Sequence, residues 1–157
     1  MPSWALWPGC VVLLLVRAFM AAAESALSGV SDLKAKELAT LHGRPGRRVL
    51  RLRTQREMTA SSLRIGMVLS GFLAAGVGAL APPAMVQFDV SRLGGIGGAL
   101  AAPLAGVLFV GLLAAVADVT ARAIASTDPE SAALRLSWLP ALLSAVLGPF
   151  ARVLLGG

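Results

Sequence analysis

Four ionisable residues interrupt long apolar runs in the sequence: Arg17, Glu24, Asp118 and Arg122. Charges in the hydrocarbon region of a membrane are costly unless they are paired or hydrated, so they indicate functional positions. Arg17 and Glu24 are seven residues apart, on nearly the same helix face, and Asp118 and Arg122 are four apart, close enough to pair. Two interpretations stay open: a neutral cluster that fixes helix register, or a site for a hard divalent cation such as Mg²⁺, which prefers oxygen ligands.

The composition indicates the kind of scaffold that carries these residues. Of the 157 residues, 57% are hydrophobic and only 14% are charged, and the mean hydropathy is +0.79. Soluble domains are nearer half apolar and about a quarter charged. We therefore predict an all-α integral membrane helical bundle over residues 1–157, with three spans at about 4–27, 64–86 and 98–125.

A basic segment, 31–62, separates the first two expected spans. It reads as a pair of short amphipathic helices at the membrane surface. Ser31 is the expected N-cap of the first helix and Gly43 its stop, and Pro45 is expected to open the second helix. The pair is expected to contact anionic membrane lipid, and nucleic acid is not an expected partner.

Two terminal segments leave alternatives open. Residues 132–155 contain Pro140 and Pro149, so they form either a fourth span or a kinked helix along the inner membrane surface, and we expect the kinked helix. The small residues 21–23 resemble a signal-peptide cleavage site. A retained span is favoured there, because no Lys or Arg precedes the apolar run and Arg17 interrupts it.

The positive charges predict the orientation of the chain in the plasma membrane. Eight of the 14 Lys and Arg residues lie between the first two spans, whereas only Arg92 lies between the second and third. The positive-inside rule puts the basic loop in the cytoplasm and the amino terminus outside.

The remaining reactive side chains do not predict an enzyme. His42 is expected to be solvated and Cys10 to pack as a small hydrophobe. The sequence has no Ser-His-Asp set, CxxC pair or nucleotide-binding loop.

Four motifs occur in a characteristic order. They are AAAESAL at 21–27, KAKELATLHGRPGRRVLRL at 34–52, LRIGMVL at 63–69, and ADVTAR at 117–122 followed by DPE at 128–130. In their order and spacing, from about Val12 to Leu155, they resemble the transmembrane domain of the CNNM/CorC (HlyC/CorC) family of magnesium and cobalt transporters.

The resemblance implies an intramembrane ion site, with Mg²⁺ as the ion and no nucleotide in this domain. The implied metal ligands are Asp118, Glu24, Ser25 and Gly66, and Arg17 and Arg122 are the expected charge partners. Several family ligand positions carry other residues here, namely Ala21 and Ala23 for serines, and Met67, Val68 and Gly71 for asparagines. We hypothesise that the Arg17 guanidinium takes the charge role of the ion by pairing with Asp118 or Glu24.

The expected function is therefore transport or efflux of a divalent cation, Mg²⁺ or Co²⁺, through a degenerate ion site. The alternative is a non-transporting membrane subunit that scaffolds or modulates a full-length relative, and a third interpretation is an unrelated membrane anchor. The family likeness implies a homodimer, or a heterodimer with a full-length member. The chain contains no segment with the length or composition of the family's CBS modules, so nucleotide regulation is expected to reside elsewhere.

Overall fold

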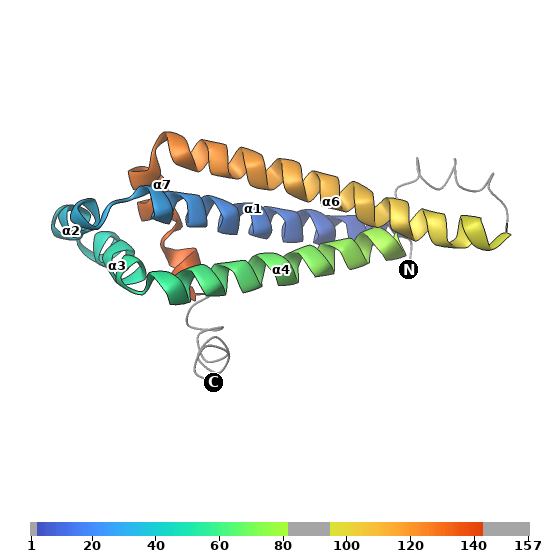
Figure 1. Ribbon diagram of the computed structural model, residues 1–157, viewed down its shortest axis with the longest axis horizontal. Coiled ribbons are helices and arrows are strands. Elements are labelled where there is room, and N and C mark those ends of the chain that lie inside the picture. The colour runs from blue at the N-terminus through green and yellow to red at the C-terminus, as the bar shows by residue number, and fades with distance from the viewer. Residues whose placement is uncertain (1–2, 82–94, 143–157) are drawn as a thin grey trace. The chain divides into compact units, whose positions relative to one another are not determined.

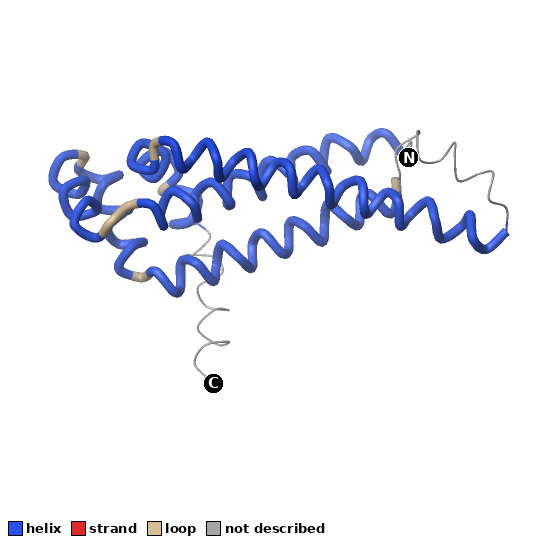
Figure 2. Tube along the Cα trace, turned by 45° about the horizontal axis from the view of Figure 1, so that its top comes forward, coloured by secondary structure: helices blue, strands red, loops and turns tan. Residues whose placement is uncertain are grey.

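The computed structural model describes residues 3–81 and 95–142, and every regular element within these ranges is helical (Figures 1 and 2). In chain order the elements are η1 (Ser3–Leu6), α1 (Trp7–Gly29), α2 (Asp32–Leu41), α3 (Gly43–Thr54), α4 (Arg56–Leu80), α6 (Gly95–Thr127) and α7 (Pro129–Leu136). The predicted all-α fold class is confirmed.

Three of these helices are long and apolar enough to cross a membrane: Trp7–Gly29, Arg56–Leu80 and Leu100–Thr127. The first has 23 residues, and at 1.5 Å per residue it is about 35 Å long, against about 30 Å of hydrocarbon. Large apolar side chains on these helices face outward, with Phe72 74% and Leu108 73% exposed. Such a surface suits contact with lipid chains, as expected for a membrane helical bundle.

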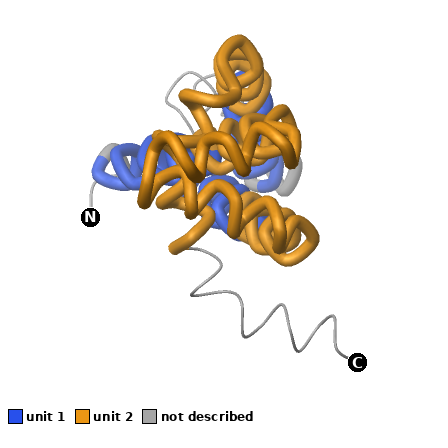
Figure 3. The backbone as a smooth tube through the Cα atoms, turned by 90° about the vertical axis from the view of Figure 1, so that its left-hand side faces the viewer, with its two compact units in different colours: residues 1–17, 68–117 blue, residues 18–67, 118–157 orange. Residues whose placement is uncertain are grey.

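The chain divides into two compact units (Figure 3). The first unit comprises residues 1–17 and 68–117, and the second comprises residues 18–67 and 118–157. Helices α1, α4 and α6 each contribute residues to both units, whereas α2, α3 and α7 belong to the second unit alone.

Small residues hold the helices of the first unit close together. Cys10, Ala74 and Val110 form a buried cluster that joins segments of α1, α4 and α6. Cys10 is fully buried, with its sulfur 3.9 Å from the carbonyl oxygen of Ala74, so it packs as the expected small hydrophobe. Trp7 and Phe109 add an edge-to-face contact, with ring centroids 6.4 Å apart.

At Gly78, α4 and α6 lie close together within the first unit. A Cβ atom at this position would lie 2.7 Å from the carbonyl oxygen of Gly106 and 2.8 Å from Cγ2 of Val110. Both distances are shorter than van der Waals contact. Glycine is therefore required here by the packing of two membrane helices, a use of small residues that is common between spans.

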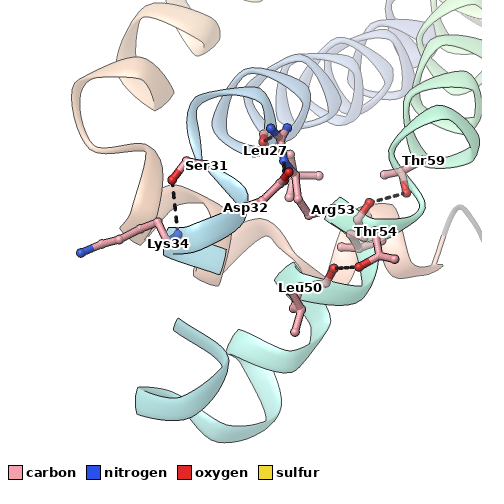
Figure 4. Close-up of polar contacts among 9 residues, drawn as sticks. Leu27, Ser31, Asp32, Lys34, Leu50, Arg53, Thr54 and Thr59 are labelled. Carbon is pink, nitrogen blue, oxygen red and sulfur yellow. Dashed lines mark hydrogen bonds and ion pairs between the residues drawn. The ribbon is translucent and has the colours of Figure 1, made fainter. Parts of the chain in front are cut away.

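Helices α2 and α3 pack against each other in the second unit, and α3 also contacts α7. Ser31 is the N-cap of α2, as predicted, and its Oγ accepts a hydrogen bond of 3.3 Å from the backbone N–H of Lys34 (Figure 4). Gly43 has a positive φ of 57° at the sharp turn between the helices. A Cβ atom at Gly46 would overlap the carbonyl group of Leu38, so the two backbones touch.

A continuous apolar core joins this helix pair to the ends of the longer helices. Its buried members are Ala22, Ala26, Leu27, Val30, Ala35, Leu38, Val49, Leu52, Ala125 and Ala133. They come from α1, α2, α3, α6 and α7 and the link after α1. The helix pair is thus fixed by burial of its apolar face, while Arg44, Arg47, Arg48 and Arg51 stay exposed and Arg53 is mostly buried.

The connections around the helix pair are very short. His42 alone separates α2 from α3, and Gln55 alone separates α3 from α4. The second helix of the pair is predicted to extend to 62, whereas α3 ends at Thr54 and residues 56–62 begin α4. The helix is interrupted because Gln55 leaves helical geometry, with φ −100° and ψ 42°. The hydroxyl of Thr59 then donates to the carbonyl of Leu52 across the turn.

The segment after α6 begins with a capped helix, α7. The Asp128 carboxylate accepts a hydrogen bond of 3.2 Å from the backbone N–H of Ser131, and Pro129 opens the helix. Hydrogen bonds from Ser131, first from its side chain and then from its backbone N–H, lower the pKa of Asp128, because they favour the charged carboxylate. Of the expected terminal helix 132–155, residues 132–136 belong to α7 and 138–142 are helical; the remainder, with Pro149, lies outside the described residues.

Replacing Gly78 by alanine should destabilise the protein, because the added methyl group would press against the α6 backbone. We expect a loss of about 1–3 kcal/mol, the usual cost of overpacking a tight contact. Gly76→Ala is the matched control, since no described atom lies within 4 Å of a Cβ placed there. Thermal unfolding in a mild detergent measures both variants, and equal melting temperatures would contradict the assigned packing.

Candidate functional site

Glu24 forms ion pairs with two arginines in the second unit. Its Oε1 lies 3.4 Å from Nε of Arg64, and its Oε2 lies 3.2 Å from Nη2 of Arg122. The Glu24 side chain is only 23% exposed, whereas those of Arg64 and Arg122 are 74% and 51% exposed. A mostly buried carboxylate is therefore neutralised by two guanidinium groups that reach it from a wetter surface.

These ion pairs join the ends of three candidate spans. Glu24 lies near the end of α1, Arg64 near the beginning of α4 and Arg122 near the end of α6. Ser25 adds a link between α1 and α6, because its hydroxyl donates a hydrogen bond of 3.4 Å to the carbonyl oxygen of Arg122. Residues far apart in the sequence are thereby brought to one polar cluster, which we call the Glu24 cluster: Glu24, Ser25, Arg64 and Arg122.

The other expected ligands lie on the same helices. Gly66 is buried on α4, and Asp118 is half-buried on α6, one turn before Arg122. The spacing of Asp118 and Arg122 predicts that they can pair along one face, whereas the ion pair of Arg122 described above is made with Glu24. Among the described residues, no three His, Cys, Asp or Glu side chains gather at metal-binding distances.

Arg17 belongs to the first unit, where Gly71 leaves space for its side chain. Arg17 is half-buried, and a Cβ atom at Gly71 would clash with its Nη1. Gly71 stands where the family resemblance implies an asparagine ligand. An arginine guanidinium thus occupies space that a side chain at this position would need.

The arrangement at Glu24 limits what the cluster can bind. The four residues of the Glu24 cluster help to line a pocket of 350 Å³. A divalent cation at the Glu24 carboxylate would face two guanidinium groups within hydrogen-bond distance of the same oxygens, and like charges repel strongly at such range. The two ion pairs therefore oppose cation binding at Glu24.

Arg64 is not among the four ionisable residues singled out in the sequence, although it pairs with Glu24. The available signal is its position in LRIGMVL, where a guanidinium stands at the very start of the second expected span. A permanent charge at that depth needs a carboxylate partner or the membrane surface. Spacing along one helix does not reveal the partner, because Glu24 lies 40 residues earlier in the chain.

Residues 9–156 match the protein family described as the "Cyclin M transmembrane N-terminal domain", abbreviated CNNM. The match includes all three candidate spans apart from the first two residues of α1, and it also includes α2, α3 and α7. Comparisons with curated proteins and with solved structures gave no match.

Replacing Glu24 by glutamine should lower stability, because Arg64 and Arg122 would lose the carboxylate with which both form ion pairs. Hydrogen bonds to charged groups typically contribute about 1.5–3 kcal/mol, and a loss toward the lower end is expected at this partly exposed site. Glu57→Gln, an exposed glutamate in the first turn of α4, is the control. Thermal unfolding in detergent provides the measurement, and a Glu24→Gln variant as stable as Glu57→Gln would refute the structural role.

Proposed function

The chain belongs to the CNNM family, a family of membrane domains generally linked to divalent-cation transport, and on that premise we propose that it transports Mg²⁺ or Co²⁺ across the membrane. The observation that carries this proposal is the family match, which extends over residues 9–156. In this reading the cation is cargo that passes between the helices, and the site that receives it is degenerate.

We assign the cargo site to oxygen atoms near the meeting ends of the spans. Asp118 supplies the principal carboxylate, and the Ser25 hydroxyl, the Gly66 carbonyl and Glu24 are the further candidate donors. Hard divalent cations favour such oxygens, and Mg²⁺ requires nearly octahedral coordination. The proposal is supported by the half-buried position of Asp118 and by the family resemblance. The arginines beside Glu24 oppose cation binding there, which is why we describe the site as degenerate.

We also propose an orientation and an assembly. The chain lies in the plasma membrane with its amino terminus outside, and the helix pair α2 and α3 contacts anionic lipid on the cytoplasmic side. The concentration of Lys and Arg between the first two spans supports this orientation. The working assembly is a homodimer, or a heterodimer with a full-length member of the family.

A second function is favoured by a specific observation, the contact between Arg17 and Gly71. A guanidinium that fills the space of a ligand side chain would lock the pathway, because it carries a permanent positive charge. The chain would then act as a non-transporting subunit that scaffolds or modulates a full-length relative. When the chain is expressed alone, the first function predicts a fall in cell Mg²⁺ and the second predicts no change.

Transport is tested by expressing the chain in cells that lack their own magnesium exporters and measuring cell Mg²⁺. If the chain transports, cell Mg²⁺ falls, and Asp118→Ala abolishes the change because the main carboxylate ligand is lost. Glu57→Ala serves as the control and should transport normally. No change alone, but altered export when a full-length relative is co-expressed, would support the modulating subunit and contradict the first proposal.

The locked pathway is tested by a pair of substitutions at Arg17 and Gly71. Gly71→Asn alone should lower the melting temperature, because the new side chain clashes with the guanidinium. The double variant Arg17→Ala/Gly71→Asn removes the clash, restores an oxygen donor and should gain a Mg²⁺-dependent rise in melting temperature of a few degrees. The unaltered protein should show no such rise. A clear rise in the melting temperature of the unaltered protein with Mg²⁺, compared with buffer that contains no divalent cation, would contradict a locked site.

A further inference from the structure

We propose that the pocket beside the Glu24 cluster binds a phosphate group, carried by a lipid headgroup or free in solution. The pocket has a volume of 350 Å³ and lies entirely within the second unit. Its walls come from α1, α3, α4 and α6. This assignment concerns an anion, so it does not depend on whether the chain transports cations.

Positive charge is in excess around this pocket. Four arginines line it, Arg53, Arg56, Arg64 and Arg122, against the single carboxylate of Glu24. Arg64 contacts Glu24 through Nε and Arg122 contacts it through Nη2. Each guanidinium has five N–H donors, so several donors of both arginines remain for a second acceptor. Asp32 pairs with Arg53 from outside the pocket lining, and the two carboxylates still leave an excess of positive charge that an additional anion can neutralise.

Arg53 is the most rigidly held of the four arginines. Its side chain is 15% exposed, and it is anchored at two points (Figure 4). Nε lies 2.8 Å from Oδ1 of Asp32, and Nη1 donates a hydrogen bond of 3.2 Å to the carbonyl oxygen of Leu27. These contacts fix the plane of the guanidinium and leave its Nη2 group as a donor, an arrangement that reduces the entropy lost when an anion binds.

Arg56 differs from Arg53 in being exposed rather than anchored. It stands at the first position of α4, immediately after the turn at Gln55, and its side chain is exposed. Within residues 3–81 and 95–142, its side chain makes no ion pair or hydrogen bond. The turn that separates it from Arg53 is held by the Thr59 hydroxyl bond to Leu52. An uncommitted guanidinium therefore faces the same pocket as an anchored one.

The chemistry favours phosphate over other anions. Arginine forks bind phosphate through paired N–H donors, and several forks around one pocket match a group with three or more acceptor oxygens better than a carboxylate with two. Leu27, Leu52 and Leu63 provide apolar surface in the same pocket. The pocket also lies where candidate spans end, which is the depth of lipid phosphates, and anionic headgroups are attracted to basic segments at that depth.

The experiment uses the full chain, purified in a neutral detergent and freed of bound lipid. Melting temperature is followed while short-chain phosphatidylglycerol, short-chain phosphatidylcholine or inorganic phosphate is added, with chloride at equal ionic strength as a reference. We expect a saturable rise with phosphatidylglycerol or with inorganic phosphate. A rise with the lipid alone identifies a headgroup site, whereas a rise with inorganic phosphate that competes with the lipid identifies a site for free phosphate.

Arg56→Gln is the informative variant, because its side chain is exposed and its loss should leave the fold intact. We expect its apparent Kd to rise about tenfold, the effect of losing one charge-assisted contact. Arg48→Gln removes the same charge from an exposed position on α3 outside the pocket, and it should leave the Kd within about twofold. Arg56→Lys keeps the charge but loses the fork, so an intermediate Kd is expected.

Three results would overturn the proposal. The first is the absence of any saturable rise with either phosphate source. The second is an equal response to phosphatidylglycerol and phosphatidylcholine that Arg56→Gln does not alter. The third is an equal loss of affinity in Arg48→Gln and Arg56→Gln, which would indicate general attraction between a basic surface and an anion.

Discussion

A carboxylate that is mostly withdrawn from water must have positive partners, and in this protein the partners of Glu24 come from two other helices. Coulomb attraction at about 3 Å is strong wherever water is partly excluded, and leaving one member unpaired is costly. Charge balance at Glu24 therefore requires α1, α4 and α6 to meet at these ends. The core that fixes α2, α3 and α7 is built beside the same meeting point.

This requirement bears on the family function. In a cation site of the usual kind, carboxylates inside a membrane are neutralised by the ion that they bind. Here the protein supplies covalently attached cations at Glu24, and Gly71 makes room for another guanidinium in the first unit. Structural neutralisation and ion binding compete for the same oxygens. The two ion pairs neutralise Glu24 without a bound cation.

Local patterns in the sequence are sufficient to predict most of the helices. Apolar runs of more than 20 residues predict the three long helices, and Ser31 predicts the start of α2, since capping depends on a single side chain and its near neighbours. The end of α3 is not predicted, because the turn at Gln55 contains no glycine or proline. Arg122 is expected as a charge partner, but local spacing does not predict that it and Arg64 pair with Glu24, because they lie 98 and 40 residues away and depend on helix packing.

The candidate site is predicted only in part, because its contacts also depend on helix packing between residues far apart in the sequence. Arg17, Glu24, Asp118 and Arg122 stand out because a charge inside an apolar run is conspicuous. Arg53 and Arg56 do not stand out, because they are two of many arginines in a basic segment. Their place in the lining of the pocket distinguishes these two from the other arginines of the segment, and that place depends on the three-dimensional structure.

The single-residue connections at His42 and Gln55 have a mechanical consequence. Gly46 brings α3 against the carbonyl of Leu38, so α2 and α3 cannot separate without breaking a backbone-to-backbone contact and the core beneath it. Only Val30 and Ser31 join the hairpin to α1, and only Gln55 joins it to α4, so a tilt or axial shift of this end of α1 would displace the hairpin and the first turn of α4 together. The basic segment is thus a stiff linkage, through which whatever grips its outer arginines can exert force on two membrane helices at once.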